Sequence, residues 1–136
     1  IADSLMELAG LTVPVLTIIT GEGGSGGALA LAAGDQVWML ENAVYSILSP
    51  EGFSSILWKD STKAKEAAEV MKLTAADLYS QGIIEKMICE PEGYSEQTLY
   101  QVTDILDKEI TDFLEEYRNY SEEVLLEKRY ERFRKF

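Results

Sequence analysis

The sequence has 136 residues, 46% of them hydrophobic, which is enough for one domain with a modest core and argues against disorder. Its 24 acidic and 12 basic residues give a formal net charge of −12, which argues against a nucleic-acid groove as the main function. There is no histidine and only one cysteine, so this chain by itself excludes Ser-His-Asp and Cys-His catalysis, histidine-based metal sites, an internal disulfide and a CxxC zinc site.

The residues before Pro14 have the pattern of a helix already under way. Leu5 and Leu8, with Met6 beside them, show amphipathic spacing, and no capping residue precedes Ile1. The chain begins without a methionine, so we expect a piece whose N-terminal portion is missing. No run approaches the roughly 18–20 apolar residues of a membrane span and no signal peptide is visible, so the default expectation is a cytoplasmic protein.

A buried strand is predicted over residues 15–20, and it leads directly into the glycine segment GEGGSGG, residues 21–27. A short helix of small residues is predicted next, over residues 28–33. Five glycines in seven positions are costly, because glycine loses more conformational freedom on folding than any other residue. The glycine segment therefore requires an explanation in chemistry or in packing.

Four interpretations fit the glycine spacing. Gly21, Gly23 and Gly26 match the G-x-G-x-x-G dinucleotide fingerprint, and Glu41 follows Gly21 at the distance expected of a ribose ligand. Residues 23–27 match the G-x-S-x-G elbow of hydrolases, with Ser25 in the nucleophile position. The third interpretation is an oxyanion hole of backbone N–H groups at a helix start. The fourth is a tight turn with close helix packing and no chemistry.

The rest of the chain argues against two of these interpretations. The hydrolase elbow has no histidine base within the chain. Strands are predicted over residues 37–40 and 43–48 with no room for a helix between them, whereas a doubly wound dinucleotide fold needs helical crossovers. The oxyanion hole and the tight turn remain open.

Helices dominate the second half of the chain. Ser49, Pro50 and Glu51 have the marks of a helix start, and the apolar residues of that helix would be Phe53, Ile56, Leu57 and Trp58. Further helices are predicted over residues 59–72 and 74–82, followed by a strand over residues 83–88 and a turn over residues 90–93. A long amphipathic helix comes next, with an apolar face of Leu99, Val102, Leu106, Ile110, Phe113, Leu114 and Tyr117, and Ser121 caps a final helix.

Other predictions concern single residues. We expect Cys89 to be a small buried residue near a strand end. Trp38 and Trp58 are expected in the core or at an interface. The basic residues from Lys128 to Lys135 are expected to form the solvated face of an amphipathic helix rather than a phosphate site.

The order of strand, glycine segment, small helix, two strands and helices, with the segment LTAADLYSQGIIEKMI, resembles the crotonase superfamily. The run GEGGSGGALALAAGDQVWMLENAVYSILSPEGFSSILWKD resembles more closely the alpha-subunit family of bacterial acetyl-CoA carboxylase carboxyltransferases, and the likeness extends to the terminal RYERFRKF. The resemblance implies an α/β fold, the C-terminal part of a crotonase-like β-β-α spiral followed by C-terminal helices. It also implies a carboxyltransferase domain over residues 1–93 and a helical extension over residues 94–136.

For this family, the resemblance implies transfer of the carboxyl group from carboxybiotin to acetyl-CoA, which gives malonyl-CoA for fatty-acid synthesis. It implies a zinc-bearing beta subunit in an α2β2 assembly, a biotin carboxyl carrier protein, and biotin carboxylase in the wider complex of the bacterial cytoplasm. Biotin arrives on the carrier protein, acetyl-CoA is the substrate, and zinc is expected only on the beta subunit. No metal site, membrane or nucleic-acid partner is expected for this chain.

The expected site lies in the glycine segment. Gly26 and Gly27 stand where the segment enters the helix, so they are the candidate N–H donors to an oxyanion. Gly23, Gly24 and Ser25 are the candidate loop on the biotin side, with Gly23 and Gly24 expected to make the turn.

Glu22, Glu41 and Glu51 are expected in structural roles. The alternative function is another crotonase-type acyl-CoA enzyme, a hydratase or an isomerase, for which Glu41 or Glu51 would have to act as acid and base. A scaffold without catalysis, in which the glycines only pack, is the third possibility.

Overall fold

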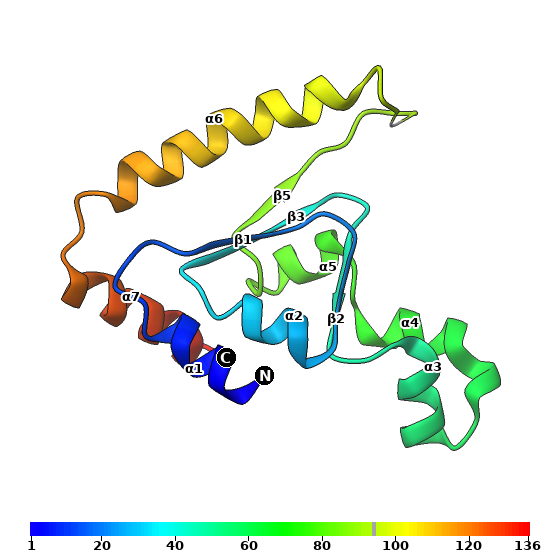
Figure 1. Ribbon diagram of the computed structural model, residues 1–136. Helices are drawn as coiled ribbons and strands as arrows, with labels where there is room; N and C mark the ends of the chain where they lie inside the picture. The colour runs from blue at the N-terminus through cyan, green and yellow to red at the C-terminus, as the bar shows by residue number, and fades with distance from the viewer. Residues whose placement is uncertain (94) are drawn as a thin grey trace.

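The computed structural model describes residues 1–93 and 95–136, and a three-stranded parallel sheet lies at its centre (Figure 1). Its strands are β1 (Leu16–Ile19), β3 (Gln36–Leu40) and β5 (Lys86–Ile88), in the order β1-β3-β5. The middle strand is the most buried, because each residue from Val37 to Leu40 is at most 4% exposed. Such a continuous apolar run is typical of a parallel strand covered on both faces.

A second sheet of two parallel strands, β2 (Glu22–Gly24) and β4 (Val44–Ser46), pairs Gly23 with Tyr45. Both strands of this pair bend away from the central sheet, as the path from β1 to β2 in Figure 1 shows. The prediction that Gly23 and Gly24 make a turn was therefore wrong. Glycine has no side chain to show strand alternation, and pairing with β4 determines this strand.

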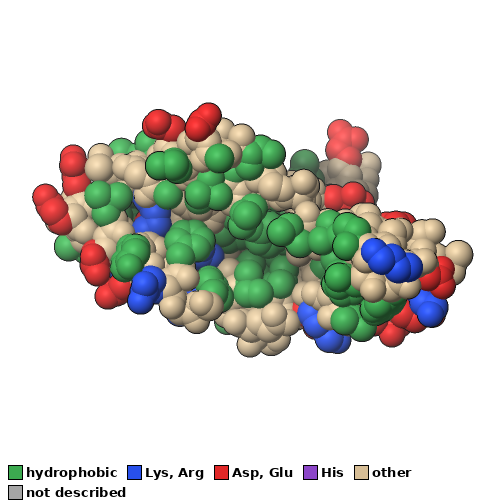
Figure 2. Space-filling view, turned by 90° about the horizontal axis from the view of Figure 1, so that it is seen from below, with side chains coloured by type: hydrophobic (Ala, Val, Ile, Leu, Met, Phe, Trp, Pro, Cys, Tyr) green, Lys and Arg blue, Asp and Glu red, His purple; other side chains and the backbone are tan. Residues whose placement is uncertain are grey.

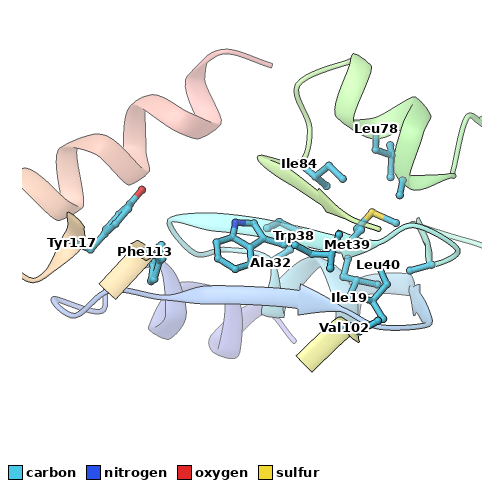
Figure 3. Close-up of a cluster of buried hydrophobic side chains, with 14 of the residues drawn as sticks. Ile19, Ala32, Trp38, Met39, Leu40, Leu78, Ile84, Val102, Phe113 and Tyr117 are labelled. Atoms are coloured by element: carbon cyan, nitrogen blue, oxygen red, sulfur yellow. The ribbon is translucent and has the colours of Figure 1, made fainter. Parts of the chain in front are cut away.

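Helices cover the central sheet. In Figure 1, α6 (Leu99–Tyr117) lies on one side of the sheet and α5 (Ala75–Ser80) lies on the other. Figure 3 shows the same arrangement in the core, with Leu78 of α5 and Val102 of α6 on opposite sides of β3. Phe113 of α6 meets the ring of Trp38 edge to face, with the ring centroids 6.1 Å apart. Lys86 of β5 forms an ion pair with Glu109 of α6. The sheet and α6 thus share one hydrophobic core, and Trp38 lies in that core as predicted.

Two short helices precede the central strands. The helix α1 (Ala2–Ala9) confirms the predicted helix before Pro14, with Leu5 and Leu8 half-buried and Met6 exposed. The helix α2 (Ser25–Leu31) begins three residues earlier than the predicted range 28–33. It starts directly at the end of β2, with Gly26 and Gly27 already helical.

The segment after β4 forms a small helical lobe, at the lower right of Figure 1. It contains α3 (Pro50–Phe53), a π-helix η1 (Ser54–Trp58), a 3₁₀ turn η2 (Ser61–Lys63) and α4 (Ala64–Met71). The single helix predicted over residues 59–72 was wrong. Lys59 has a left-handed φ of 58° that ends η1, and Asp60 accepts a hydrogen bond from the Thr62 N–H, which starts a separate turn. Trp58 packs edge to face on Phe53.

The strand predicted over residues 83–88 is present only from Lys86 onward. Ile83 instead donates its N–H to Leu78, at the end of α5, and its carbonyl accepts from Arg132. Cys89 follows β5 but is exposed, so the expectation that it is buried was wrong. The boundary expected between residues 93 and 94 stays a prediction, and Tyr94 itself lies outside the described residues.

The last helix, α7 (Glu122–Arg134), lies beside α1, so the two ends of the chain are close together (Figure 1). The expectation that its basic residues are solvated was wrong for Arg129, which is only 3% exposed. Its guanidinium forms a bidentate ion pair with buried Asp35, at 3.0 and 2.9 Å, and also donates to the carbonyls of Leu8, Ala9, Leu11 and Val13. We call this set of contacts the Arg129 clamp.

Arg132 has a similar role one turn later. It forms a bidentate contact with Glu85, at 2.7 and 2.9 Å, and Glu85 in turn accepts the N–H of Val37 in the central strand. These two arginines therefore attach α7 to the sheet. Among the described helices, none is both long and apolar enough to cross a membrane.

Candidate functional site

The glycine segment forms a strand that passes into a helix without an intervening loop. Gly24 has extended backbone, with φ −126° and ψ 155°, and holds the N-cap position of α2. No side chain caps this helix, so the first-turn N–H groups of Gly26 and Gly27 are not satisfied by a capping hydroxyl or carboxylate. The strand–glycine–helix order predicted from the sequence is confirmed.

Packing within the chain accounts for only some of these glycines. A Cβ on Gly23 would lie 3.1 Å from Ile19 Cγ2, and one on Gly26 would lie 3.3 Å from Ile1 Cγ2. At Gly21, Gly24 and Gly27 a Cβ would meet nothing within 4 Å among the described residues. None of the five has a positive φ. A tight turn with close packing therefore does not explain Gly21, Gly24 and Gly27.

The glycine with the strongest steric requirement lies elsewhere. At Gly34 a Cβ would come within 2.7 Å of the Val15 carbonyl oxygen, which no backbone contact tolerates. Gly34 was not singled out from the sequence. Its neighbour Asp35 accepts the Val15 N–H at 2.7 Å, so this close approach fixes the start of β1.

A cavity of about 540 Å³ opens beside the glycine segment, and we call it the loop cavity. It is lined by Glu22, Gly23, Gly24 and Ser25 and by the start of α3, Ser49, Pro50 and Glu51. The structure thus brings three predicted site residues together, Gly23, Gly24 and Ser25, with two carboxylates. Gly26 and Gly27 belong to the same segment but do not line this cavity.

Apolar space lies next to the loop cavity. One cavity of about 410 Å³ is lined mainly by apolar side chains of β4, α3 and η1, and a smaller one of about 190 Å³ reaches from Ser25 to α5. Ile47, Ile56 and Leu57 on this surface are each more than 60% exposed. Figure 2 shows hydrophobic side chains gathered along the middle of the face seen from below and onto the helical lobe.

These apolar residues were not predicted as part of a site. The signal that could have revealed them was present, because Phe53, Ile56, Leu57 and Trp58 place apolar groups around most of a short helix rather than on one stripe.

Tyr45 lines both apolar cavities, and its pairing with Gly23 connects it to the glycine segment. Burial raises the pKa of the Tyr45 phenol above its ordinary value, although the nearby charge of Arg132 acts in the opposite direction. The phenol is therefore protonated at neutral pH and can act as a hydrogen-bond donor, but not as a base. Sequence reasoning missed this residue.

The two glutamates that could be an acid and a base are in different places. Glu41 accepts the N–H of Glu90 at 3.0 Å, and its own N–H bonds to the Ile88 carbonyl, so it ties the end of β3 to the end of β5. Glu51 lies in the first turn of α3 and also lines the loop cavity, where it is joined by Glu22. The predicted structural roles of Glu41 and Glu51 are present, and Glu51 has access to the cavity as well.

Over residues 1–93 and 95–136, no group of three or more cysteine, aspartate or glutamate side chains could hold a metal ion.

Residues 1–136 match the family described as acetyl co-enzyme A carboxylase carboxyltransferase-like. A protein of Streptococcus equi subsp. zooepidemicus named acetyl-coenzyme A carboxylase carboxyl transferase subunit alpha is 54% identical over the whole chain, which covers 52% of that relative. A protein of the same name from Clostridium acetobutylicum is 53% identical over 98% of the chain and is covered to 49%. The chain thus spans about half the length of the curated relatives it matches.

Solved structures with the same fold are more distant in sequence. The transcarboxylase 12S structure with methylmalonyl-coenzyme A bound has a TM-score of 0.66 and 21% identity, over 86% of this chain and 22% of that chain. A Pseudomonas malonate decarboxylase hetero-tetramer in complex with coenzyme A has a TM-score of 0.65 and 16% identity, over 94% of this chain and 51% of that chain. An enoyl-CoA hydratase of Mycobacterium avium subsp. paratuberculosis has a TM-score of 0.58 and 19% identity, over 91% of this chain and 50% of that chain. These likenesses confirm the predicted crotonase-like fold.

Proposed function

The chain belongs to the acetyl co-enzyme A carboxylase carboxyltransferase-like family, and from this membership we propose that it is the C-terminal portion of a carboxyltransferase alpha subunit. The reaction proposed is transfer of a carboxyl group from carboxybiotin to acetyl-CoA, which gives malonyl-CoA for fatty-acid synthesis. The observation that carries the proposal is the sequence identity to two alpha subunits, 54% over 100% of this chain and 53% over 98% of it.

The dimensions and chemistry of the site support this proposal. The loop cavity, at about 540 Å³, has the size of a pocket for a small organic ligand. Gly24 lines it, and a side chain at Gly24 would extend into open space rather than against another residue. Backbone without side chains can be approached closely by a ligand. We therefore assign Gly23, Gly24 and Ser25 to the biotin-side wall of the site.

Gly26 and Gly27 are the proposed donors to the reacting group. Carboxybiotin, when bound, would supply the carboxyl group that is transferred. Backbone N–H groups in the uncapped first turn of α2 would stabilise negative charge that develops on an oxygen during the transfer. Open space at Gly27 leaves its backbone accessible to such an oxygen. The adjacent apolar cavities, with Tyr45, would exclude water from the site.

The proposed partners are a beta subunit in an α2β2 assembly, a biotin carboxyl carrier protein, and biotin carboxylase in a wider complex of the bacterial cytoplasm. Zinc is proposed only for the beta subunit. Support comes from the naming of the relatives as alpha subunits and from the hetero-tetramer formed by the related malonate decarboxylase.

A hydratase or isomerase is the second candidate function. It is favoured by one observation, that Glu22 and Glu51 line the same cavity and could in principle act as acid and base.

One experiment separates the two functions. The native-length subunit is assembled with its beta subunit and supplied with biocytin, a free biotin derivative, and malonyl-CoA. This assay follows the reverse of the proposed reaction, in which malonyl-CoA gives its carboxyl group to biocytin and becomes acetyl-CoA. We expect this transfer to require both subunits, and chromatography detects the acetyl-CoA that forms. Hydration of crotonyl-CoA by the same preparation, without carboxyl transfer, would contradict the proposed reaction and support the hydratase.

A further inference from the structure

Ser25 has the left-handed backbone conformation that glycine usually adopts, whereas the glycines on either side of it do not. The glycines of the segment all lack positive φ angles, whereas Ser25, which lies between two pairs of them, has a φ of 64°. The left-handed region is the one in which glycine is favoured and a residue with a Cβ is strained. The chain thus has serine at the position of this segment where glycine would be most favourable.

Helix-end geometry does not explain this conformation. The two other described residues with a Cβ and a positive φ, Lys59 and Lys72, are the C-caps of η1 and α4, where a left-handed residue is a common way to end a helix. Ser25 instead begins α2. Strained backbone of this kind is retained where the surrounding structure or a function requires it.

The Ser25 hydroxyl also differs from the other hydroxyls at helix starts. Ser49, Thr74 and Ser121 each accept an N–H from the first turn of their helix. The Ser25 side chain makes no hydrogen bond to another described residue, and it lines both the loop cavity and the smaller apolar cavity of about 190 Å³. Its hydroxyl is exposed and available to a molecule in these cavities.

The charge of the loop cavity limits what that molecule presents to the hydroxyl. Glu22 and Glu51 line the cavity, and among its described lining residues none is a lysine or an arginine. A carboxylate or phosphate group beside Glu22 and Glu51 would be repelled by both carboxylates, so the carboxyl group of carboxybiotin would lie outside this cavity, on the side of Gly26 and Gly27. An uncharged acceptor oxygen meets no such repulsion.

From these observations we infer that the Ser25 hydroxyl donates a hydrogen bond to an uncharged carbonyl oxygen of a ligand, either of a urea or of a thioester. The inference rests on the proposed function, in which both groups enter the site, and it assigns Ser25 a direct contact with a reactant. No base is required, because the serine acts as a donor and not as a nucleophile.

The test uses Ser25→Gly and Ser25→Ala in the native-length subunit assembled with its beta subunit. Ser25→Gly relieves the backbone strain and removes the hydroxyl, so we expect the melting temperature to rise by about 2–4 °C. We expect kcat/KM for transfer to fall by about 10–100-fold, between the loss of a neutral hydrogen bond and of an oxyanion donor. Ser25→Ala should lose the same activity without the gain in melting temperature.

The matched control is Gly82→Ala. Gly82 has a φ of 70° with open space around it, so alanine there introduces only the backbone strain. This variant should melt at a lower temperature than wild type and transfer carboxyl groups normally. A purely structural role for Ser25 would move stability and activity in the same direction, whereas our inference predicts opposite directions for Ser25→Gly.

Binding measurements identify the carbonyl that is contacted and do not depend on turnover. Titration calorimetry gives the Kd of biocytin, which carries the urea, and of acetyl-CoA, which carries the thioester. We expect Ser25→Gly to weaken one of the two by about 3–10-fold. If the wild-type assembly transfers no carboxyl group, the proposed reaction is overturned. The Kd values of wild type and Ser25→Gly would still show whether Ser25 contacts a ligand. Unchanged Kd values and unchanged kcat/KM in Ser25→Gly would overturn the inference itself.

Discussion

Gly26 and Gly27 differ in their surroundings, which makes Gly27 the better position for testing the proposed oxyanion donors. A side chain at Gly26 would press on Ile1, whereas one at Gly27 would enter open space. We expect Gly27→Val, and with it Gly26→Val, to reduce carboxyl transfer by about 10²–10³-fold, the effect of losing one oxyanion donor, because the added side chain would keep the oxygen away from the backbone N–H. Gly21→Val is the control, because Gly21 also has open space but lies before the helix. Circular dichroism checks folding, and a folded Gly27→Val with normal turnover would refute the assignment.

The glutamates test whether a side chain of this chain serves as an essential base. We expect Glu22→Gln and Glu51→Gln each to lower transfer by less than about 10²-fold, since general-base catalysis contributes 10²–10⁴-fold. Glu41→Gln is the matched variant outside the loop cavity, and its effect should appear in stability because Glu41 connects β3 to β5. A larger loss of turnover in folded Glu51→Gln would favour the hydratase-like alternative.

At the scale of helices and strands, side-chain chemistry made some elements predictable and left others hidden. The caps Ser49, Thr74 and Ser121 identified the starts of α3, α5 and α7, because a hydroxyl followed by an acidic first turn has few other uses. The strand β2 consists of Glu22 and two glycines, so no alternation could reveal it. The crotonase-like order followed from a resemblance and not from periodicity.

The cap of α5 allows a quantitative test. Thr74 accepts the Asp77 N–H at 3.3 Å and donates to the Asp77 carboxylate at 2.7 Å, so both residues support the first turn. We expect Thr74→Ala to lower the free energy of unfolding by about 1 kcal/mol. Thr103→Ala is the control, since Thr103 lies exposed within α6 and caps nothing. Urea unfolding followed by tryptophan fluorescence compares them, and equal stabilities would show that this cap contributes nothing.

At the scale of the whole molecule, the Arg129 clamp attaches the last helix to the first helix and to the sheet. Arg129→Ala would leave the Asp35 carboxylate buried without its partner, a change that destabilises proteins by about 3–5 kcal/mol. Arg134→Ala, at an exposed position on the same helix, should change stability by no more than about 0.5 kcal/mol. Urea unfolding of the native-length subunit measures both. An Arg129→Ala protein as stable as wild type would show that water replaces the clamp.

The edges of the central sheet lead to a second expectation at this scale. Among the described strands, β1 and β5 each pair only with β3, so each has an edge without a strand partner. Such edges promote association with other chains. We therefore expect residues 1–136 alone not to form a stable, active monomer, as light scattering after size exclusion would show. A monodisperse 15.2 kDa species with cooperative unfolding would contradict this.

The site and the clamp could be predicted from the sequence to different degrees. The glycine segment was recognisable because five glycines between a strand and a helix are rare without a purpose. The cavity beside it could not be predicted, because Glu51 and Ser25 come to line the same cavity only through the parallel pairing of β2 with β4. The partnership of Asp35 with Arg129 was also hidden, since 94 residues separate them and no periodic pattern connects residues at that distance.

That separation also orders events during synthesis of the chain. Ribosomes add about 5–20 residues per second, so Asp35 leaves the exit tunnel roughly 5–20 seconds before Arg129 does. Through that interval the carboxylate cannot be buried at its final position, since its counter-ion has not yet been made. The end of α1 and the segment that leads into β1 contain the carbonyls that the same guanidinium binds, so these contacts also form only after Arg129 has emerged. We therefore expect the nascent chain to complete the Arg129 clamp only after α7 has emerged, and until then the residues that the clamp holds would need protection by chaperones or by other parts of the polypeptide.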